Sequence, residues 1–280
     1  MKRHYYKTSL FLFAILAFQI THAQTDSAQK DAETFKISIN YNSNLNYYGR
    51  TDSLQSSGVF PMAELWLSDK FYINAAPVFI NNAVQRMDYA GTVATAGYQH
   101  LTDKWFSHLY VMKPFYKESS GLVQSALKAQ GGFSVSNLNK VANITLGADV
   151  KWSDAADFGA TAGLDHAFRI EDKNGIVFVI NPSVYAYAGT QRFSQTYTQR
   201  KKGNLLFPGR TETVTENYNR FTILAYEASV PLIVAKGAWQ LIATPAYVVP
   251  QNLLQVPGEP QLSEKGKNTF YTTLALKYSF

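Results

Sequence analysis

The sequence has no cysteine among its 280 residues, and only 16% of the residues are charged. The missing cysteine excludes a disulfide-stapled scaffold, a thiolate metal site and a lipid anchor on cysteine. Soluble domains carry about 25% charged residues, so the chain is charge-poor for that class. After the amino-terminal segment, no stretch approaches the roughly 18 consecutive apolar residues of a membrane-spanning helix. Neither an ordinary soluble domain nor a helical membrane protein fits these absences.

The amino-terminal segment has the three parts of a secretory signal peptide. Lys2, Arg3 and Lys7 form a positive region, and an apolar stretch over Ser9–Ile20 follows. Small residues at Thr21–Ala23 predict cleavage before Gln24, so residues 1–23 are the expected signal peptide. An uncleaved anchor would need about 20 apolar residues, more than this stretch supplies. Without the three basic residues the formal charge of +6 falls to +3, and we expect no nucleic-acid partner.

The remaining chain alternates apolar and polar residues with a period of two, the pattern of half-exposed β-strands. The first strand shows this clearly, because Phe35, Ile37, Ile39 and Tyr41 alternate with polar residues, and Leu45 and Tyr47 extend the pattern. Aromatic residues make up 14% of the chain, with 18 Tyr and 18 Phe. The expected strands are 35–42, 59–67, 71–80, 87–99, 105–116, 124–136, 142–152, 157–170, 176–188, 221–234, 238–249 and 270–280.

The connections between these strands alternate in length. Every second connection is a turn of about three to six residues, whereas most of the others are longer and polar. Twelve strands fit best, although ten or fourteen would fit the same pattern. With an even number of antiparallel strands, the first strand starts and the last strand ends at the same end of the sheet. Alternating short and long connections, an even strand count and many aromatic residues are typical of transmembrane β-barrels.

The last eleven residues, Phe270–Phe280, alternate strictly and end on an aromatic residue. This ending resembles the closing strand of bacterial outer-membrane β-barrels, with Leu274, Leu276, Tyr278 and Phe280 on the apolar face as the assembly signal. The resemblance implies an all-β fold, a transmembrane antiparallel up-and-down barrel over residues 35–280, after a short periplasmic lead at 24–34. A soluble β-sandwich or a lipocalin-like barrel is the alternative.

The same resemblance implies a location and partners. We expect a single barrel in the outer membrane of a Gram-negative bacterium, with both termini in the periplasm. Outer-membrane lipid and lipopolysaccharide would surround it, and the barrel assembly machinery would insert it.

Charged residues on the face opposite the apolar one should point into the lumen. They could line a narrow passage for ions or small solutes, or neutralise one another as salt bridges, and Tyr185, Tyr187 and Tyr271 would narrow the passage. The expected lumen-lining charges are Lys36, Glu64, Asp149, Lys151, Asp157, Asp165, Arg169, Glu227 and Lys277.

A long polar stretch from Gly189 to Asn219 is the expected external loop. A basic and aromatic patch at this position could meet lipopolysaccharide phosphates, an anionic solute or a protein partner. It could also be an ordinary solvated loop, or fold inward as a constriction. The residues of this patch are Arg192, Phe193, Tyr197, Arg200, Lys201, Lys202 and Arg210.

Catalytic and metal-binding patterns are weak in this sequence. Beyond the signal peptide the chain has His100, His108 and His166, none in a metal-ligand spacing. Ser107 precedes His108, but neighbouring strand residues point to opposite faces. We therefore expect no metal, no cofactor and no enzyme activity. The functions considered are a narrow channel, a non-conducting surface or assembly barrel and, least favoured, a lipid-modifying enzyme.

Overall fold

The computed structural model describes residues 34–51, 55–117, 127–153, 155–200, 211–253 and 266–280, so the expected signal peptide lies outside the described residues. For Thr51 and for residues 192–200 and 211–219 it describes the backbone alone. Within these ranges, no helix is long and apolar enough to cross a membrane. The strands are β1 Thr34–Asn42, β2 Asn46–Tyr47, β3 Arg50–Thr51, β4 Ser57–Trp66, β5 Phe71–Asn81, β6 Asp88–Leu101, β7 Trp105–Tyr116, β8 Ala129–Asn137, β9 Asn143–Trp152, β10 Ala156–Asp165, β11 Phe168–Glu171, β12 Ile176–Ile180, β13 Ser183–Arg200, β14 Thr211–Ser229, β15 Leu232–Lys236, β16 Trp239–Pro250 and β17 Thr269–Ser279.

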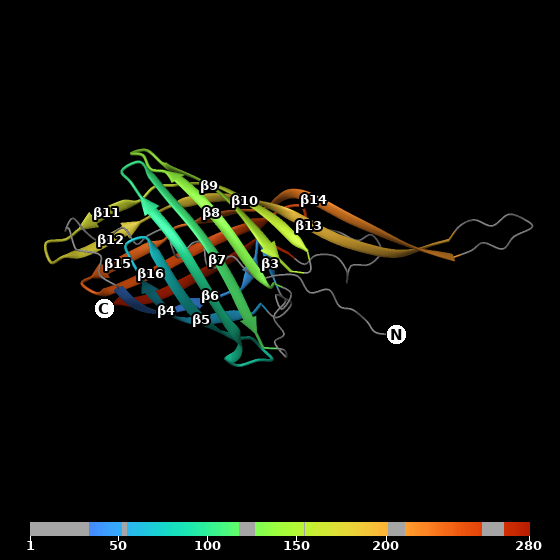
Figure 1. Ribbon diagram of the computed structural model, residues 1–280, viewed down its shortest axis with the longest axis horizontal. Helices are drawn as coiled ribbons and strands as arrows, with labels where there is room; N and C mark the ends of the chain where they lie inside the picture. Colours follow the sequence, from blue (N-terminus) through green and yellow to red (C-terminus); the bar gives the residue numbers. More distant parts are fainter. Residues whose placement is uncertain (1–33, 52–54, 118–126, 154, 201–210, 254–265) are drawn as a thin grey trace, which may run out of the picture.

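Twelve of these strands form a closed antiparallel barrel, which confirms the predicted fold class (Figure 1). Around the barrel the order is β1, β4, β5, β6, β7, β8, β9, β10, β13, β14, β16 and β17. The barrel closes where β1 pairs with β17, in a register that sets Ile37 against Tyr278 and Tyr41 against Leu274. Closure leaves the barrel wall without an unpaired edge, the condition for a sheet to cross a membrane.

Both chain ends of the barrel lie at the same end, which we call the near end. There the Phe280 amide donates to the Phe35 carbonyl at 2.9 Å. The short turns after β4, β6, β8, β11 and β15 also lie at the near end, and the longer connections lie at the opposite, far end. The predicted alternation of connections is therefore present, with one exception: the far-end connection at 153–155 is short, as the sequence also indicates.

The outer face is apolar around the whole circumference. Aliphatic side chains such as Ile39, Val111 and Leu146 are more than half exposed there. Exposed aromatic residues lie toward both ends of the barrel. At the near end they are Phe35, Phe71, Trp105, Trp239 and Phe280, and toward the far end Phe115, Trp152, Phe158 and Phe221. This combination of an apolar band and an aromatic girdle is what a membrane-spanning barrel presents to lipid.

Three of the expected strands are interrupted near the near end. β10 and β11 are separated at His166, β12 and β13 at Asn181 and Pro182, and β14 and β15 at Val230 and Pro231. Proline has no N–H to donate to the ladder. Single backbone bonds to proline carbonyls bridge the breaks, from His166 to Pro182 at 3.2 Å, Asn181 to Pro231 at 2.9 Å and Val230 to Pro245 at 3.0 Å. Beyond the breaks, β11, β12 and β15 extend the sheet on one side of the barrel.

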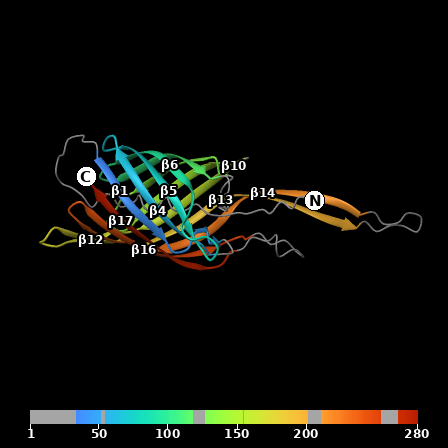
Figure 2. The ribbon, with the colours of Figure 1, turned by 90° about the horizontal axis from the view of Figure 1, so that it is seen from below.

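The predicted external loop at Gly189–Asn219 was wrong for most of its length. Gly189–Arg200 belongs to β13 and pairs with Thr211–Thr222 of β14, so only 201–210 remains between the strands, outside the described residues. The paired segments project from the far end, away from the lumen (Figures 1 and 2). Outside the membrane a strand needs no apolar face, so hydrophobic alternation could not reveal it. We call this pair the projecting hairpin.

The first strand also differs from the prediction. β1 ends at Asn42, and Leu45 and Tyr47 do not extend it. Instead the chain turns inward and forms the short hairpin of β2 and β3, which we call the lumen hairpin (residues 43–51). Its turn has positive φ at Tyr48 (53°) and Gly49 (74°), the geometry of a tight two-residue hairpin turn.

Candidate functional site in the barrel lumen

The lumen hairpin crosses the interior of the barrel and touches both sides of the wall. Leu45 packs in a buried cluster with inward residues of β5, β6 and β7, among them Val78 and Met112. Tyr48 packs in a second cluster on the opposite wall, with inward residues of β13, β14, β16 and β17. Its ring lies 5.1 Å from that of Tyr187. Since Leu45 and Tyr48 are only 2% and 4% exposed, the hairpin fills the far half of the lumen.

Arg50 fixes the lumen hairpin to the wall. Its side chain is buried, and its guanidinium donates to the carbonyls of Leu224 at 3.1 Å, Tyr48 at 3.3 Å and Gln251 at 3.3 Å. Backbone bonds add to this attachment, because the Lys267 amide donates to the Gly49 carbonyl at 3.2 Å. Hydrogen bonds that involve a charged donor contribute about 1.5–3 kcal/mol each, so the attachment is strong.

Charges of opposite sign neutralise one another in the near half of the lumen. Glu64, which is 1% exposed, accepts hydrogen bonds from Lys277 at 2.9 Å and from the Trp66 indole at 2.8 Å. The Lys36 ammonium lies 4.6 Å from the centre of the Trp66 ring. A buried carboxylate is stable when it is paired in this way.

A second set of polar contacts lines β5, β7 and β8. The Tyr72 hydroxyl lies 2.8 Å from Nε2 of His108, and the Gln130 amide donates to the Tyr110 hydroxyl at 2.9 Å. On the other wall Tyr271 donates to Glu227 at 2.7 Å. These networks tie side chains to the wall rather than leave them free toward an open passage.

Three tyrosine rings lie flat over glycines of the neighbouring strand. A Cβ atom added at Gly163 would clash with the Tyr185 ring, one at Gly97 with the Tyr72 ring, and one at Gly132 would lie 2.8 Å from the Tyr110 ring. Glycine allows this close approach because it has no side chain. The tyrosines thus cover the wall, and sequence reasoning missed the pairing because it requires the strand register.

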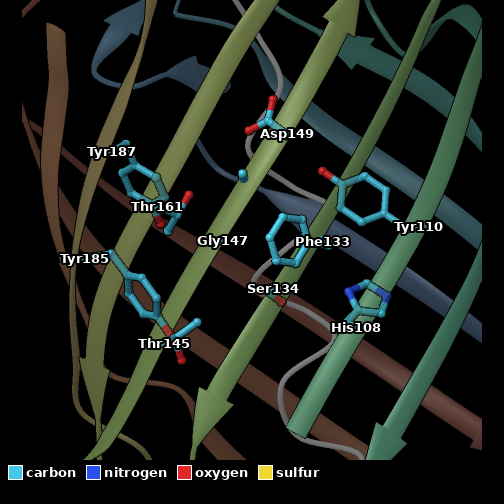
Figure 3. A pocket seen from close by; sticks show the side chains of 11 residues that line it. His108, Tyr110, Phe133, Ser134, Thr145, Gly147, Asp149, Thr161, Tyr185 and Tyr187 are labelled. Atoms are coloured by element: carbon cyan, nitrogen blue, oxygen red, sulfur yellow. The ribbon is translucent and has the colours of Figure 1, made fainter.

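A cavity with a volume of about 30 Å³ lies against the inner face of β7, β8, β9, β10 and β13. Tyr185 and Tyr187 line one side and His108 and Tyr110 the other, with Thr145 and Asp149 between them (Figure 3). The volume suffices for about one water molecule. An ion with its hydration shell would need more room than this cavity gives.

The expected lumen charges can now be placed. Asp149 forms an ion pair with Lys151, and Asp165 accepts from the Asn143 amide at 2.9 Å. Asp157 is partly buried on the inner face. Arg169 differs, because it lies in β11 beyond the strand break, 46% exposed, and pairs with Glu171. The others, Lys36, Glu64, Glu227 and Lys277, lie in the networks described above.

The remaining predicted residues fall into three groups. Leu274, Leu276, Tyr278 and Phe280 lie on the outer face of β17 and at its end. Arg192, Phe193, Tyr197 and Arg200 lie in β13, not in a loop, and only their backbone is described. Lys201, Lys202 and Arg210 lie outside the described residues.

The histidines lie apart from one another. His108 faces the lumen, while Ser107 faces the other way and its hydroxyl contacts the His100 carbonyl at 3.5 Å. His166 lies at the break after β10, against the Phe168 ring. Within the described residues, no cluster of three or more His, Asp or Glu side chains could hold a metal ion.

Comparison with known proteins gives similarity of fold. No protein-family model matches the chain, and no curated protein matches it. The COG4313 outer membrane channel from Pseudomonas putida F1 is 12% identical, covering 92% of this chain and 100% of that one, with a TM-score of 0.45. LpxR from Salmonella typhimurium is 11% identical, covering 87% and 99%, with a TM-score of 0.41. The beta domain of the Bordetella autotransporter BrkA is 9% identical, covering 90% and 100%, with a TM-score of 0.42. Similarity at this level assigns no activity to the chain.

Proposed function

We propose that the protein is an outer-membrane β-barrel that is closed to solutes at rest and acts at the cell surface through its projecting hairpin. One observation carries the proposal: the lumen hairpin crosses the barrel and is bonded to its wall through Arg50. The proposal includes an orientation in which the near end, with both chain ends, faces the periplasm. The proposal departs from the narrow channel that the sequence favoured.

The projecting hairpin is the surface that would meet a partner. Its strands continue beyond the barrel, and the sequence between Arg192 and Arg210 contains five basic residues. Basic side chains interspersed with aromatic ones suit phosphate-bearing ligands, and lipopolysaccharide offers such phosphates at the cell surface. We propose no catalytic role, because Ser107 and His108 lie on opposite faces of the wall and Ser107 contacts the backbone carbonyl of His100, not its ring.

A gated channel is the second candidate, because the lumen hairpin is a connection rather than part of the wall. Behind it the inner face carries charges of both signs, including Lys36, Asp149 and Lys277. If the hairpin left the lumen, a polar passage would remain.

Conductance in a planar bilayer distinguishes the two candidates. The refolded protein is compared with Arg50→Ala and with a variant whose residues 44–55 are replaced by a short glycine linker, after heat-modifiable gel mobility has confirmed folding. If none of the three proteins shows conductance steps, the closed barrel is supported. Discrete steps from the two variants alone support the gated channel, and steps from the unaltered protein contradict the proposal of a barrel closed at rest.

Binding to lipopolysaccharide tests the surface role separately. The unaltered protein is expected to bind lipopolysaccharide micelles more tightly than a variant with Lys201, Lys202 and Arg210 changed to Gln. Equal binding by both proteins would mean that these three basic side chains do not contribute to lipopolysaccharide binding.

A further inference from the structure

The outer face of the barrel contains a groove beside the strand breaks. It has a volume of about 550 Å³ and opens outward on β10, β13, β14, β16 and β17. One row of paired residues runs across all five strands, since Leu164 pairs with Val184, Val184 with Ala228, Ala228 with Tyr247, and Tyr247 with Phe270. The smallest side chain, Ala228, stands in the middle of the row. The groove therefore has a shallow floor between bulky walls.

The interrupted strands explain why the wall is hollowed here. Pro182 and Pro245 line the groove on the near-end side of Ala228, together with Val230. Val230 is bonded to the Pro245 carbonyl across the break between β14 and β15. The ladder is thus interrupted in neighbouring strands at the same height. On the opposite wall β5, β6 and β7 pair without such a break, apart from a register shift between Val78 and Phe79.

The lining of the groove is chemically suited to an acyl chain. Leu164, Val184 and Phe270 are each more than half exposed, and they continue the apolar band that faces lipid around the barrel. The groove is thus part of the surface that the membrane covers. Acyl chains are the material that fills an apolar hollow at that depth.

The near-end margin of the groove offers a place for a headgroup. His166 lines this margin, and its imidazole can donate a hydrogen bond to a phosphate oxygen. Ala142 lines the same margin, and Lys140 lies two residues earlier in the exposed turn between β8 and β9. Asp165 also lines the groove, but it is buried and accepts a hydrogen bond from the Asn143 amide at 2.9 Å. The positive charge and the hydrogen-bond donor at this margin fit a phospholipid.

We propose that this groove binds one phospholipid of the near-end leaflet, with an acyl chain over Ala228 and the phosphate beside His166. The choice of phospholipid over lipopolysaccharide rests on the proposed orientation, in which the near end faces the periplasm. The site is independent of the lumen, so it stands whether or not the barrel conducts.

Native mass spectrometry with palmitoyl-oleoyl-phosphatidylglycerol tests the site. Ala228→Phe fills the floor of the groove, and Ala96→Phe is the matched control because Ala96 is exposed on the outer face of β6. We expect Ala228→Phe to weaken binding of the first lipid roughly tenfold, the loss for about two methylene groups leaving an apolar site. Ala96→Phe should bind like the unaltered protein. His166→Ala should weaken phosphatidylglycerol binding more than binding of the uncharged diacylglycerol.

Several outcomes would overturn the proposal. Equal binding by all the variants would mean that the lipid is held elsewhere. Equal weakening by both phenylalanine variants would mean that lipid covers the whole outer face without a site. Preferential binding of lipid A over phosphatidylglycerol in the same groove would exclude a phospholipid site. Since folding is checked by gel mobility and conductance is measured separately, failure here leaves the proposed function untouched.

Discussion

Two connections at the far end of the barrel take opposite paths. The buried contacts of Leu45 and Tyr48 place the lumen hairpin inside the barrel, whereas the projecting hairpin extends away from it (Figure 2). The first carries Leu45 and Tyr48, which bury their side chains on facing walls, and a single guanidinium whose donors reach backbone carbonyls. The second is rich in threonine, glutamine and charged residues, and its strands satisfy their backbone by pairing with each other.

The difference shows what decides the path of a connection. A segment enters the lumen when it can bury apolar side chains and satisfy each polar group that it carries with it. A segment with many charges would have to desolvate them, so it stays in water and forms strands there. The lumen hairpin should therefore be sensitive to single substitutions, while the projecting hairpin should tolerate large changes without effect on the barrel.

The largest effect is expected from Tyr48→Ala. Removal of a buried aromatic ring costs about 3–5 kcal/mol, so the lumen hairpin should leave its position in a large fraction of molecules. The measurement is trypsin cleavage after Arg50 in the folded barrel, which should be at least roughly 100-fold faster than in the unaltered protein. Cleavage in the projecting hairpin serves as the internal reference.

Tyr48→Phe is the control for this substitution, because it keeps the ring in the cluster and removes the hydroxyl alone. It should resist cleavage after Arg50 almost as well as the unaltered protein. If Tyr48→Ala resisted equally well, the ring would not be what holds the hairpin in the lumen.

A smaller effect is expected from Gly49→Ala. Gly49 has a φ of 74°, and an added Cβ would lie 2.7 Å from Pro250. Gly175 is the matched control, since its φ is 70° but nothing lies within 4 Å of an added Cβ. Both substitutions should destabilise the protein by about 1 kcal/mol, because alanine disfavours the left-handed backbone conformation. Gly49→Ala should destabilise it further, because its Cβ would contact Pro250. Urea unfolding in lipid vesicles measures the free energy of unfolding of both variants, and Gly49→Ala should be the less stable. Equal destabilisation would mean that Pro250 can move away from the added Cβ without loss of stability.

Hydrophobic alternation, the lengths of the connections and the closing strand together predicted the barrel, with twelve strands as the best fit. Alternation also predicted the outward face of β17, because every membrane-spanning strand must present an apolar side to lipid. The same signal failed for Gly189–Asn219, where β13 and β14 pair with each other beyond the barrel wall (Figure 1). It also failed at the breaks near Pro182 and Pro231, because it measures side-chain polarity and not the missing N–H of proline.

The lumen was harder to predict than the wall. Alternation indicated that Glu64 and Lys277 share the inner face, yet their contact depends on the register across β4, β1 and β17. The lumen hairpin left a weaker signal. Leu45, Tyr47 and Tyr48 are apolar residues in an otherwise polar connection, and an apolar group there calls for burial. The prediction assigned Leu45 and Tyr47 to the first strand, and the lumen hairpin was therefore missed.

The smallest effect on the barrel is expected from shortening the projecting hairpin. Replacing residues 192–219 with a two-residue Asn-Gly turn leaves the pairs from Gly189–Thr222 to Gln191–Arg220 to close the hairpin. The removed segment contributes pairing that begins and ends outside the barrel wall, so stability should stay within about 0.5 kcal/mol of the unaltered protein. Urea unfolding in vesicles checks this expectation, and trypsin cleavage after Arg50 should remain as slow as before. A large loss of stability, or a newly accessible Arg50, would show that the two hairpins are coupled through β14, whose Leu224 carbonyl receives the Arg50 guanidinium.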